Sequence, residues 1–581
     1  MRARRLAGLG LWVAVVGLGG ATAALASPRF AAVVPEAGGK WRIDLGGDAP
    51  RDVRALQVAI DGVVEPASFA PRGGVLTATL RGVAPDARRL ELRDKGRAVA
   101  AVELRAPRRN ESPFAEWIVY QVMVGMFRNG SVANDSELHG WRHPRYAGGD
   151  LQGVLEEVDY LRQLGVNAVW LSPIFPAQTS HGYDVQNYYR VGPAVAVPGD
   201  AAASEMLFGG LRDALHQNGI RLILDLPLNH ASKQYQRREG DPKGFGPRST
   251  GPQQEAEKLW DSWGAGYQYW NFDHQPTRRF LTDAALHWLV DEKVDGLRLD
   301  YARGVPHDFW AELDAAVKQA KPEAFLVGEA WQDQSGVDAN AEDIATYFAP
   351  LAGKPQFDSL FDFPLQMTMT GVFAKGTEPA RRLEDTLQET AALYGPGAVP
   401  TRFLDNHDLA RFMDWTNDPD RLVAALAFMG SLGGPEVLFY GTEVGLAGGQ
   451  AKDGFTDSGR IPMPWEAPDR KLLGRVQEVL RLRSEHPALA RGGRLPLWSD
   501  DSTLVMAKLG TTELLLVALN LGPTERDLDL QPGALLPAGA TLSPVWGGGT
   551  AKVEGGKLRW QLPPRTLAIF SVAPPAPPAG P

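Results

Sequence analysis

The feature that most constrains the fold is a repeated alternation of short apolar runs and helical stretches between residues 117 and 440. The apolar runs lie at 117–123, 166–171, 221–226, 296–300, 325–328, 401–404 and 437–440. Between them apolar residues recur at helical spacing, as over 151–164, 205–217 and 278–290. Strand, helix, strand is the unit of a parallel sheet. About seven or eight such units favour a closed (β/α)8 TIM barrel over an open sheet, although periodicity alone does not decide between them.

The regions on both sides of this alternation have a different pattern. Residues 27–109 and 491–573 contain short alternating runs punctuated by Gly and Pro, which is typical of β domains. We therefore predict an N-terminal β-sandwich over 27–109, a catalytic barrel over 110–490 and a C-terminal β-sandwich over 491–573. Residues 574–581 read as a Pro-rich tail.

The first 26 residues predict an export signal. Arg2, Arg4 and Arg5 precede an apolar stretch over 6–25, and residues 24–26 offer the small-x-small pattern that a signal peptidase needs. An uncleaved membrane anchor is the alternative, because about 20 apolar residues can span a bilayer. We expect cleavage and a mature protein in the periplasm or outside the cell, without a membrane segment.

Charge and cysteine content exclude several classes of function. The chain carries 60 basic and 69 acidic residues, a formal charge of −9, and shows no basic patch. Nucleic acid and anionic membranes are therefore poor partners. The chain has no cysteine, which excludes disulfides, cysteine-ligated metal and thiol catalysis.

Polar residues end four of the apolar runs, where the active face of a parallel barrel lies. Asp225 stands in the run 221–226, Arg298 and Asp300 in 296–300, and Glu329 directly after 325–328. Asp408 follows the run at 401–404. A strand period of two places Arg298 and Asp300 on the same face, inside the barrel.

Three acids at one rim, with an arginine beside one of them, are what a retaining glycosidase requires. Arg298 would hold Asp300 as the ionised nucleophile, because an opposite charge lowers an aspartate's pKa. Burial and neighbouring carboxylates would keep Glu329 protonated as the acid/base. Each acid taken alone could equally cap a loop or make a structural ion pair, but the ordered set favours catalysis.

Six motifs, in this order along the chain, resemble the α-amylase family, glycoside hydrolase family 13. They are residues 165–173, 181–184, 225–230, 296–300, 328–329 and 406–408. The resemblance is nearest to the cyclomaltodextrinases, neopullulanases and maltogenic amylases. It implies that residues 231–276, rich in Gly, Pro and aromatics, form the small domain that this family inserts after its third barrel strand. We expect the aromatic residues of this segment to form its core rather than sugar platforms.

The resemblance also implies a role for each matching residue. Asp300 would be the nucleophile, Glu329 the acid/base, and Asp408 the third acid, which stabilises the distorted sugar. Tyr183 would stack on the sugar ring, and Asp225 would organise the site. The full set of implied substrate-binding residues is Tyr183, Asp184, Asp225, His230, Arg298 and His407.

Calcium is the one cofactor that the resemblance implies, and no organic cofactor is expected. The loop 128–135 and the segment 148–150 resemble the N-terminal calcium site of cyclodextrin glucanotransferases, and oxygen ligands of this kind suit calcium. The implied ligands are Asn129, Asn134, Asp135, Gly148 and Asp150. A hydrogen-bonded Asn/Gly turn is an equal alternative. The family's other calcium site, at Asn229, is disfavoured because Tyr269 stands where an aspartate ligand would fall.

These inferences lead us to expect an exported α-glucan hydrolase that cleaves α-1,4 bonds of maltodextrin, starch or cyclodextrin through a covalent glycosyl-enzyme. A transglycosylase is the first alternative, and a non-catalytic carbohydrate-binding or assembly protein the second. Arg303 and Gly304 stand where the family often has Lys-His facing the leaving-group sugars, so bond preference and product length stay open. A homodimer also stays open, since relatives can place an N-terminal β domain over a partner's active site.

Overall fold

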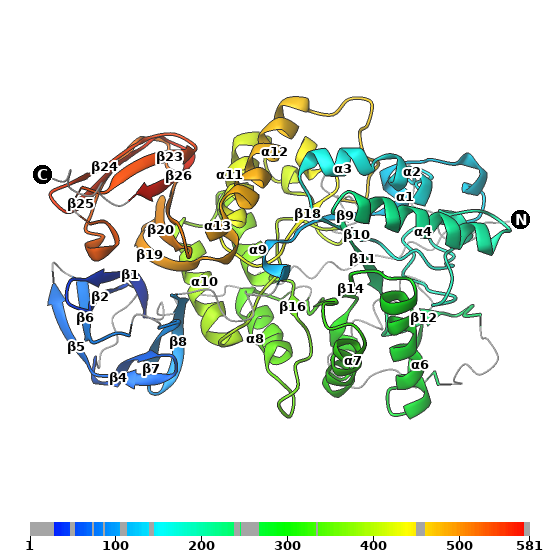
Figure 1. Ribbon diagram of the computed structural model, residues 1–581, viewed down its shortest axis with the longest axis horizontal. Helices are drawn as coiled ribbons and strands as arrows, with labels where there is room; N and C mark the ends of the chain where they lie inside the picture. Colours follow the sequence, from blue (N-terminus) through cyan, green and yellow to red (C-terminus); the bar gives the residue numbers. More distant parts are fainter. Residues whose placement is uncertain are drawn as a thin grey trace, which may run out of the picture.

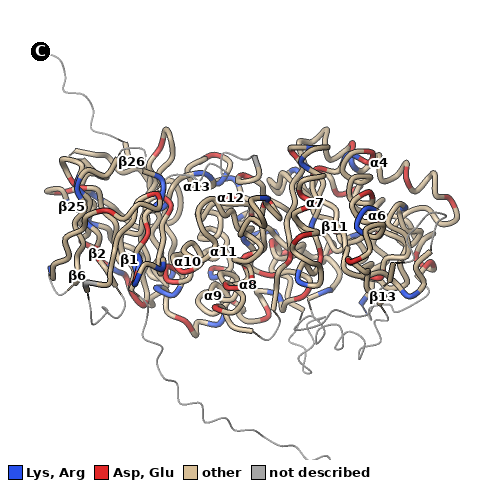
Figure 2. The backbone as a smooth tube through the Cα atoms, turned by 90° about the horizontal axis from the view of Figure 1, so that it is seen from below, with Lys and Arg blue, Asp and Glu red and all other residues tan. Residues whose placement is uncertain are grey.

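The computed structural model describes residues 28–46, 53–72, 75–84, 87–104, 113–138, 145–236, 244–245, 267–332, 335–448, 459–537 and 539–573. The molecule is elongated, with a barrel toward one end and two β domains at the other (Figures 1 and 2). The predicted leader, most of the predicted insert and the predicted Pro-rich tail lie outside the described residues. Within the described residues, acidic and basic side chains are intermixed along the chain (Figure 2).

Eight parallel strands form the barrel. They are β9 (Ile118–Val122), β10 (Ala168–Leu171), β11 (Arg221–Leu226), β14 (Gly296–Leu299), β15 (Phe325–Gly328), β16 (Ser359–Leu360), β17 (Arg402–Phe403) and β18 (Glu436–Phe439). Their order is β16-β15-β14-β11-β10-β9-β18-β17. A parallel bridge between Phe361 and Thr401 joins the two end strands. The predicted TIM barrel is therefore confirmed.

The barrel strands are apolar on both faces because both faces are covered. Every residue of β9, β10, β14, β15 and β18 is buried, as expected for a parallel sheet under helices. The predicted bounds of β11 and β15 agree with the structure. The sequence did not predict β16, because its two residues form no apolar run.

Helices surround the sheet (Figure 1). Those described are α1 (Val124–Phe127), α2 (Leu151–Glu156), α3 (Val158–Leu164), α4 (Ala201–Gln217), α6 (Gln275–Leu286), α7 (His307–Ala320), α8 (Val337–Phe348), α9 (Phe363–Met369), α10 (Arg381–Tyr394), α11 (Pro419–Gly430), α12 (Arg470–Glu485) and α13 (Pro487–Arg491). The predicted helix over 151–164 is two helices that meet at Glu157. The predicted helix over 278–290 begins earlier, at Gln275, and ends in a π-helical turn, η6 (His287–Asp291). None of the described helices is long and apolar enough to cross a bilayer.

Both flanking regions are β domains, as predicted. In the N-terminal one, β1 (Arg29–Glu36), β2 (Lys40–Gly46), β6 (Val75–Arg81) and β5 (Ala67–Arg72) form one sheet, and β4 (Val63–Glu65), β3 (Leu56–Ile60), β7 (Arg89–Asp94) and β8 (Arg97–Glu103) form the other. In the C-terminal domain, one sheet consists of β19 (Gly493–Ser499), β20 (Thr503–Leu509), β21 (Leu514–Asn520), β26 (Thr566–Ala573) and β23 (Thr541–Trp546). The other sheet consists of β22 (Arg526–Leu530), β25 (Lys557–Leu562) and β24 (Thr550–Glu554). Neighbouring strands in these sheets pair antiparallel.

The two β domains share one hydrophobic core. Phe30 and Val58 from the N-terminal domain belong to the same buried cluster as Leu495 and Trp560 from the C-terminal domain. The N-terminal domain therefore packs on the C-terminal domain of its own chain, and the two lie side by side in Figure 1.

The described edges of the predicted insert pair with each other beside the barrel. The strand β12 (His230–Ser232) is antiparallel to β13 (Tyr267–Tyr269), and Phe245 stacks on Trp270 with ring centroids 4.3 Å apart. Tyr269 and Trp270 are buried, which agrees with a packing role for these rings. Trp260 and Trp263, two other aromatic residues of the segment, lie outside the described residues.

Candidate active site

One buried guanidinium connects three carboxyl groups at the ends of neighbouring strands. Arg298 Nη1 lies 3.0 Å from Asp225 Oδ1 and 2.6 Å from Asp300 Oδ1, and its Nη2 lies 2.7 Å from Glu329 Oε1. Arg298 and Asp300 come from β14 and its end, Asp225 from β11, and Glu329 directly follows β15. The two-residue period of a strand thus places the side chains of Arg298 and Asp300 on the same face, as predicted from the sequence.

Asp225 forms the buried base of this cluster. Its Oδ2 accepts hydrogen bonds from Tyr183 Oη at 2.9 Å and from Trp170 Nε1 at 3.1 Å. Its side chain is fully buried, whereas those of Asp300 and Glu329 are 12% and 9% exposed. Burial raises the pKa of Asp225 to about 7 against the opposing effect of Arg298. Asp225 therefore orients other groups, while the two strand-end acids reach the surface of the site.

Glu329 is held from two sides. Oε1 faces Arg298, and Oε2 accepts a hydrogen bond from the Tyr301 backbone N–H at 3.1 Å. Tyr301 directs this N–H from a left-handed backbone conformation, φ 41°, which costs free energy in a non-glycine residue and is characteristic of functional sites. Burial, together with the Asp300 and Asp408 carboxylates, raises the pKa of Glu329 to about 8. Glu329 is thus protonated at neutral pH.

Asp408 is the most exposed carboxyl group of the set, with 26% of its side chain accessible. Arg460 Nη2 lies 2.6 Å from its Oδ1, and His407 Nε2 lies 3.0 Å from its Oδ2. Burial favours a higher pKa for this carboxyl, but His407, Arg460 and Arg298 more than offset that and lower its pKa. Asp408 is therefore ionised and reaches solvent.

His407 is a neutral imidazole with a defined orientation. Burial lowers its pKa to about 3. Gln121 Nε2 lies 2.7 Å from Nδ1, and Tyr183 Oη lies 2.6 Å from Nε2. Because the Tyr183 hydroxyl donates to Asp225, its oxygen accepts from His407, which assigns the proton to Nε2. The Tyr183 ring is nearly parallel to the His407 ring, with centroids 5.4 Å apart.

Two further predicted residues lie outside the ion-pair cluster. His230 is buried, and its ring lies 4.1 Å from that of Tyr267. Asp184 is also buried, and it accepts hydrogen bonds from the backbone N–H groups of Gln178 at 2.8 Å and Thr179 at 3.3 Å. Asp184 therefore fixes the loop that carries Tyr183.

Four residues of the site were not assigned a role from the sequence: Gln121, Trp170, Tyr301 and Arg460. Gln121 and Trp170 lie in apolar runs, and a polar Gln within such a run was the one available signal. Arg460 follows Asp408 at a distance of 52 residues, and no local pattern connects them. Tyr301 acts through its backbone, which a side-chain motif does not reveal.

The predicted calcium ligands do converge in space. Asp150 caps α2 and accepts hydrogen bonds from Gly130 N at 3.1 Å, Ser131 N at 2.8 Å and Asn134 Nδ2 at 3.1 Å. Asn129 Nδ2 donates to the carboxylate of Asp135 at 3.1 Å.

The donor set of this loop fits a calcium ion. The side-chain oxygens of Asn129 and Asn134 are buried and have no hydrogen-bond partner among the described residues, and two carboxylates lie beside them. Gly148 has a φ of 70°, and a Cβ there would collide with Asn129 and Asp135. Unsatisfied amide and carboxylate oxygens are the ligands that calcium prefers. At the family's other site, Tyr269 instead pairs with His230 in the strand register.

Comparison with known proteins gives a consistent picture. The family model described as "Alpha amylase, catalytic domain" matches residues 121–263 and 262–483. A cyclomaltodextrinase from Bacillus sp is 31% identical over 430 residues, which cover 69% of this chain and 72% of that protein. An intracellular maltogenic amylase from Bacillus subtilis is 30% identical over 404 residues, covering 65% and 64%.

Solved structures extend the match to the fold. The crystal structure of an α-amylase from Anoxybacillus superimposes with a TM-score of 0.67 at 27% identity, covering 80% of this chain and 99% of that one. The residues matched by the family model contain nearly all of the barrel together with Asp225, Asp300, Glu329 and Asp408. The chain therefore belongs to the α-amylase family of glycoside hydrolases, family 13, and is an enzyme of that family.

Proposed function

We propose that this enzyme hydrolyses α-1,4-glucosidic bonds of maltodextrin, starch or cyclodextrin with retention of anomeric configuration. The substrate class is supported by the relatives, which are named cyclomaltodextrinase, maltogenic amylase and α-amylase. The chemistry is supported by the Arg298 cluster, in which one acid is ionisable beside a guanidinium and another is kept protonated.

Retention is supported by the Arg298 guanidinium, which Asp300 and Glu329 share. Asp300 and Glu329 bind its two terminal nitrogens at 2.6 and 2.7 Å, which keeps the carboxyl groups close together. Retaining glycosidases need a separation of about 5–5.5 Å, because the nucleophile attacks directly and no water is placed between the acids. Inverting enzymes need a wider gap.

The proposed reaction assigns one step to each acid. Asp300 attacks the anomeric carbon while Glu329 donates its proton to the departing glycosidic oxygen. Glu329, now a carboxylate, then takes a proton from the water that hydrolyses the glycosyl-enzyme. The ionised Asp408 would accept hydrogen bonds from hydroxyls of the sugar at the cleavage point, while the Nε2–H of His407 is directed at Tyr183 Oη and Asp408.

The test is reducing-sugar release from soluble starch by wild type, Asp300→Asn and Glu329→Gln. We expect each variant to lose about 10³-fold or more in kcat, since removing a nucleophile or a general acid costs on this scale. Asp283→Asn, an exposed change on α6, is the matched control and should leave kcat unchanged. Equal release by wild type and Asp300→Asn, or NMR detection of a first product with inverted configuration, would contradict the proposal.

A second measurement distinguishes glycosyl transfer from hydrolysis. A transglycosylase passes through the same glycosyl-enzyme but lets a sugar hydroxyl attack it. Incubation with maltotriose should yield shorter products and no oligomers longer than the substrate. Longer oligomers as the main product would assign the enzyme to the transferases.

We also propose calcium binding by the loop of Asn129, Asn134, Asp135, Gly148 and Asp150. Its support is the pair of buried amide oxygens that have no hydrogen-bond partner among the described residues. Calcium in excess over EDTA should raise the melting temperature, because a ligand at 100 times its Kd stabilises by about 2.7 kcal/mol. Asn129→Asp should melt lower than wild type in EDTA, since it places a second carboxylate beside Asp135, and should gain more on adding calcium. An identical calcium response in both proteins would argue against the site.

Export is proposed from the leader pattern alone. The measurement is N-terminal sequencing of the protein from the periplasm or medium of its natural host, with Ser27 expected as the first residue. Protein retained in the cytoplasm with residues 1–26 intact would overturn this proposal.

A further inference from the structure

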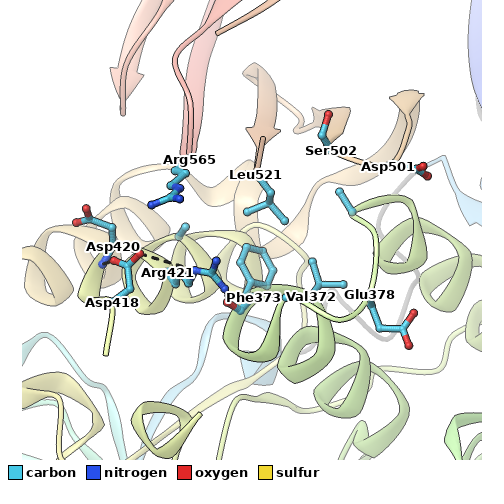
Figure 3. A pocket seen from close by; sticks show the side chains of 13 residues that line it. Val372, Phe373, Glu378, Asp418, Asp420, Arg421, Asp501, Ser502, Leu521 and Arg565 are labelled. Atoms are coloured by element: carbon cyan, nitrogen blue, oxygen red, sulfur yellow. Dashed lines mark hydrogen bonds and ion pairs between the residues drawn. The ribbon is translucent and has the colours of Figure 1, made fainter. Parts of the chain in front are cut away.

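A cavity of about 200 Å³ lies between the barrel and the C-terminal domain (Figure 3). The barrel side is formed by the π-helical turn η8 (Thr370–Lys375), the segment after it and the start of α11. The C-terminal domain contributes Asp501, Ser502, Leu521 and Arg565 from three separate connections between strands. None of the acids bound by Arg298 lines this cavity, so it is separate from the proposed catalytic centre.

The floor of the cavity is apolar and rigid. Val372 and Phe373 line it and are buried. Arg421 Nη1 donates to the Phe373 carbonyl at 3.2 Å, which fastens α11 to the end of η8. Gly376 ends η8 with a φ of 65°, and a Cβ there would lie 3.2 Å from Arg421 Nη1. The guanidinium is thus positioned by backbone geometry, and within the described residues its Nη2 donates no hydrogen bond.

The positive and negative side chains around the cavity are equal in number once those paired with arginines outside it are set aside. Asp420 is paired with Arg475 at 2.7 Å and Asp501 with Arg381 at 2.6 Å, and neither arginine lines the cavity.

The carboxylates of Glu378 and Asp418 and the guanidiniums of Arg421 and Arg565 remain, and Asp418 and Arg421 form a loose pair at 3.7 Å, drawn dashed in Figure 3. A phosphate or a divalent cation would therefore meet no excess of opposite charge. The described residues also contain no group of three or more His, Cys, Asp or Glu side chains that could hold a metal ion.

Balanced donors and acceptors above an apolar floor suit a neutral ligand rich in hydroxyls. Guanidinium N–H groups donate to hydroxyl oxygens, carboxylates accept from hydroxyl hydrogens, and the apolar floor can take the C–H face of a sugar. We propose that this cavity is an accessory binding site for about one or two glucosyl units of an α-glucan, since it is smaller than the roughly 300–1,000 Å³ of most ligand pockets. This inference rests on the proposed function.

An exposed tryptophan beside the cavity supports the same ligand class. Trp415 is 37% exposed and lies three residues before Asp418. The Lys375 ammonium lies 3.9 Å from the centre of its ring, and Lys375 immediately precedes Gly376 of the cavity wall. The ammonium occupies one face of the Trp415 ring, so a glucan chain leaving the cavity on this side would have to stack on the other face.

The test counts glucan sites on the full chain. Isothermal titration of Glu329→Gln with maltoheptaose, which this variant cannot consume, should show two sites per chain. Adding Arg565→Asn or Glu378→Gln should weaken one site by about tenfold or more while the other is unchanged. Asn tolerates the left-handed backbone at position 565, φ 51°, and the two changes lie in different domains, so misfolding of one leaves the other informative. Arg559→Gln, an exposed change on the same β domain, is the control.

Outcomes for the cavity and for catalysis are distinguishable. The cavity variants in the wild-type background should hydrolyse maltotriose at the wild-type rate. A single site in the Glu329→Gln chain, or two sites untouched by both cavity changes, would overturn the accessory site. Binding of inorganic phosphate or calcium alone that Arg565→Asn or Glu378→Gln abolishes, with no second maltoheptaose site, would overturn it as well. Failure of the wild-type chain to hydrolyse any glucan would instead sink the proposed function, whatever the site count.

Discussion

At the scale of single residues, Arg298 decides how the acids of the site divide their roles. One guanidinium contacts Asp225, Asp300 and Glu329, and a single positive charge cannot neutralise three ionised carboxylates in a buried site. The protons are held by the carboxyl groups whose pKa values burial raises most. The pKa values of Asp225 and Glu329 rise to about 7 and about 8, while that of Asp408 falls.

The pH dependence of activity follows from this division. Glu329 must carry its proton to act as an acid, so kcat/KM should fall about tenfold per pH unit above its pKa of about 8. The ionised Asp408 contributes to that raised pKa. Asp408→Asn should therefore move the midpoint of the basic limb to lower pH, whatever its effect on the maximum rate. The measurement is a kcat/KM profile on maltotriose for both proteins. A midpoint that stays in place or moves upward would show that Asp408 does not influence Glu329.

At the scale of elements, barrel strands supply polar groups to the site from within apolar runs. Gln121 of β9 and Trp170 of β10 are buried, and each binds a side chain from another strand end. A different situation arises in β20 of the antiparallel C-terminal domain, where Lys508 is buried beside its register partner Arg494. Burial, followed by the charges of Arg494, Arg483 and Arg402, holds the pKa of Lys508 well below its usual range.

Lys508→Met should accordingly stabilise the protein. A depressed lysine pKa means that the unfolded chain binds more protons than the folded one, so wild-type stability should rise with pH toward the unfolded pKa of about 10.4. Methionine has no proton to lose on folding and so removes this cost, which is about 1.4 kcal/mol for each unit by which the lysine pKa is depressed. Denaturant unfolding at several pH values checks both effects, with Lys552→Met as the exposed control. A strong loss of stability would mean that the Lys508 ammonium is charged and well paired.

At the scale of the whole molecule, hydrogen bonds attach the N-terminal domain to the barrel of the same chain. The side-chain amide of Gln388 on α10 makes two hydrogen bonds to the backbone of Phe30, as a neighbouring strand would. Its Oε1 accepts from Phe30 N and its Nε2 donates to Phe30 O, both at 2.8 Å. Arg89 Nη2 adds a hydrogen bond to the carbonyl of Ala391 at 2.7 Å. The Gln388 contacts join β1 to the barrel helix α10 across 358 residues, and the Arg89 contact joins β7 to the same helix across 302 residues.

Gln388→Ala should loosen this domain without stopping catalysis. It leaves a buried N–H and a buried C=O of Phe30 without partners, at about 1–3 kcal/mol for each group. We expect faster proteolysis within residues 29–103 and a kcat on maltotriose within about twofold of wild type. Gln217→Ala, at the exposed end of α4, controls for the loss of a glutamine. Unchanged proteolysis would show that the shared core with the C-terminal domain suffices to hold the N-terminal one.

The sequence by itself determined the alternation of strands and helices, both β domains and the positions of the candidate acids, because these depend on short-range patterns. Closure of the sheet into a barrel was favoured by the number of units and by the family resemblance, and the tertiary structure established it. A parallel strand buried on both faces is mostly apolar, and a polar residue at its end lies at the carboxyl rim. Only the tertiary structure decided which groups those acids contact. Gln121 meets His407 across 286 residues, and Arg460 meets Asp408 across 52. The burial that shifts the pKa values of Glu329 and Lys508 likewise arises only when distant segments pack together, because desolvation depends on every neighbour in space and not on the neighbours in the chain.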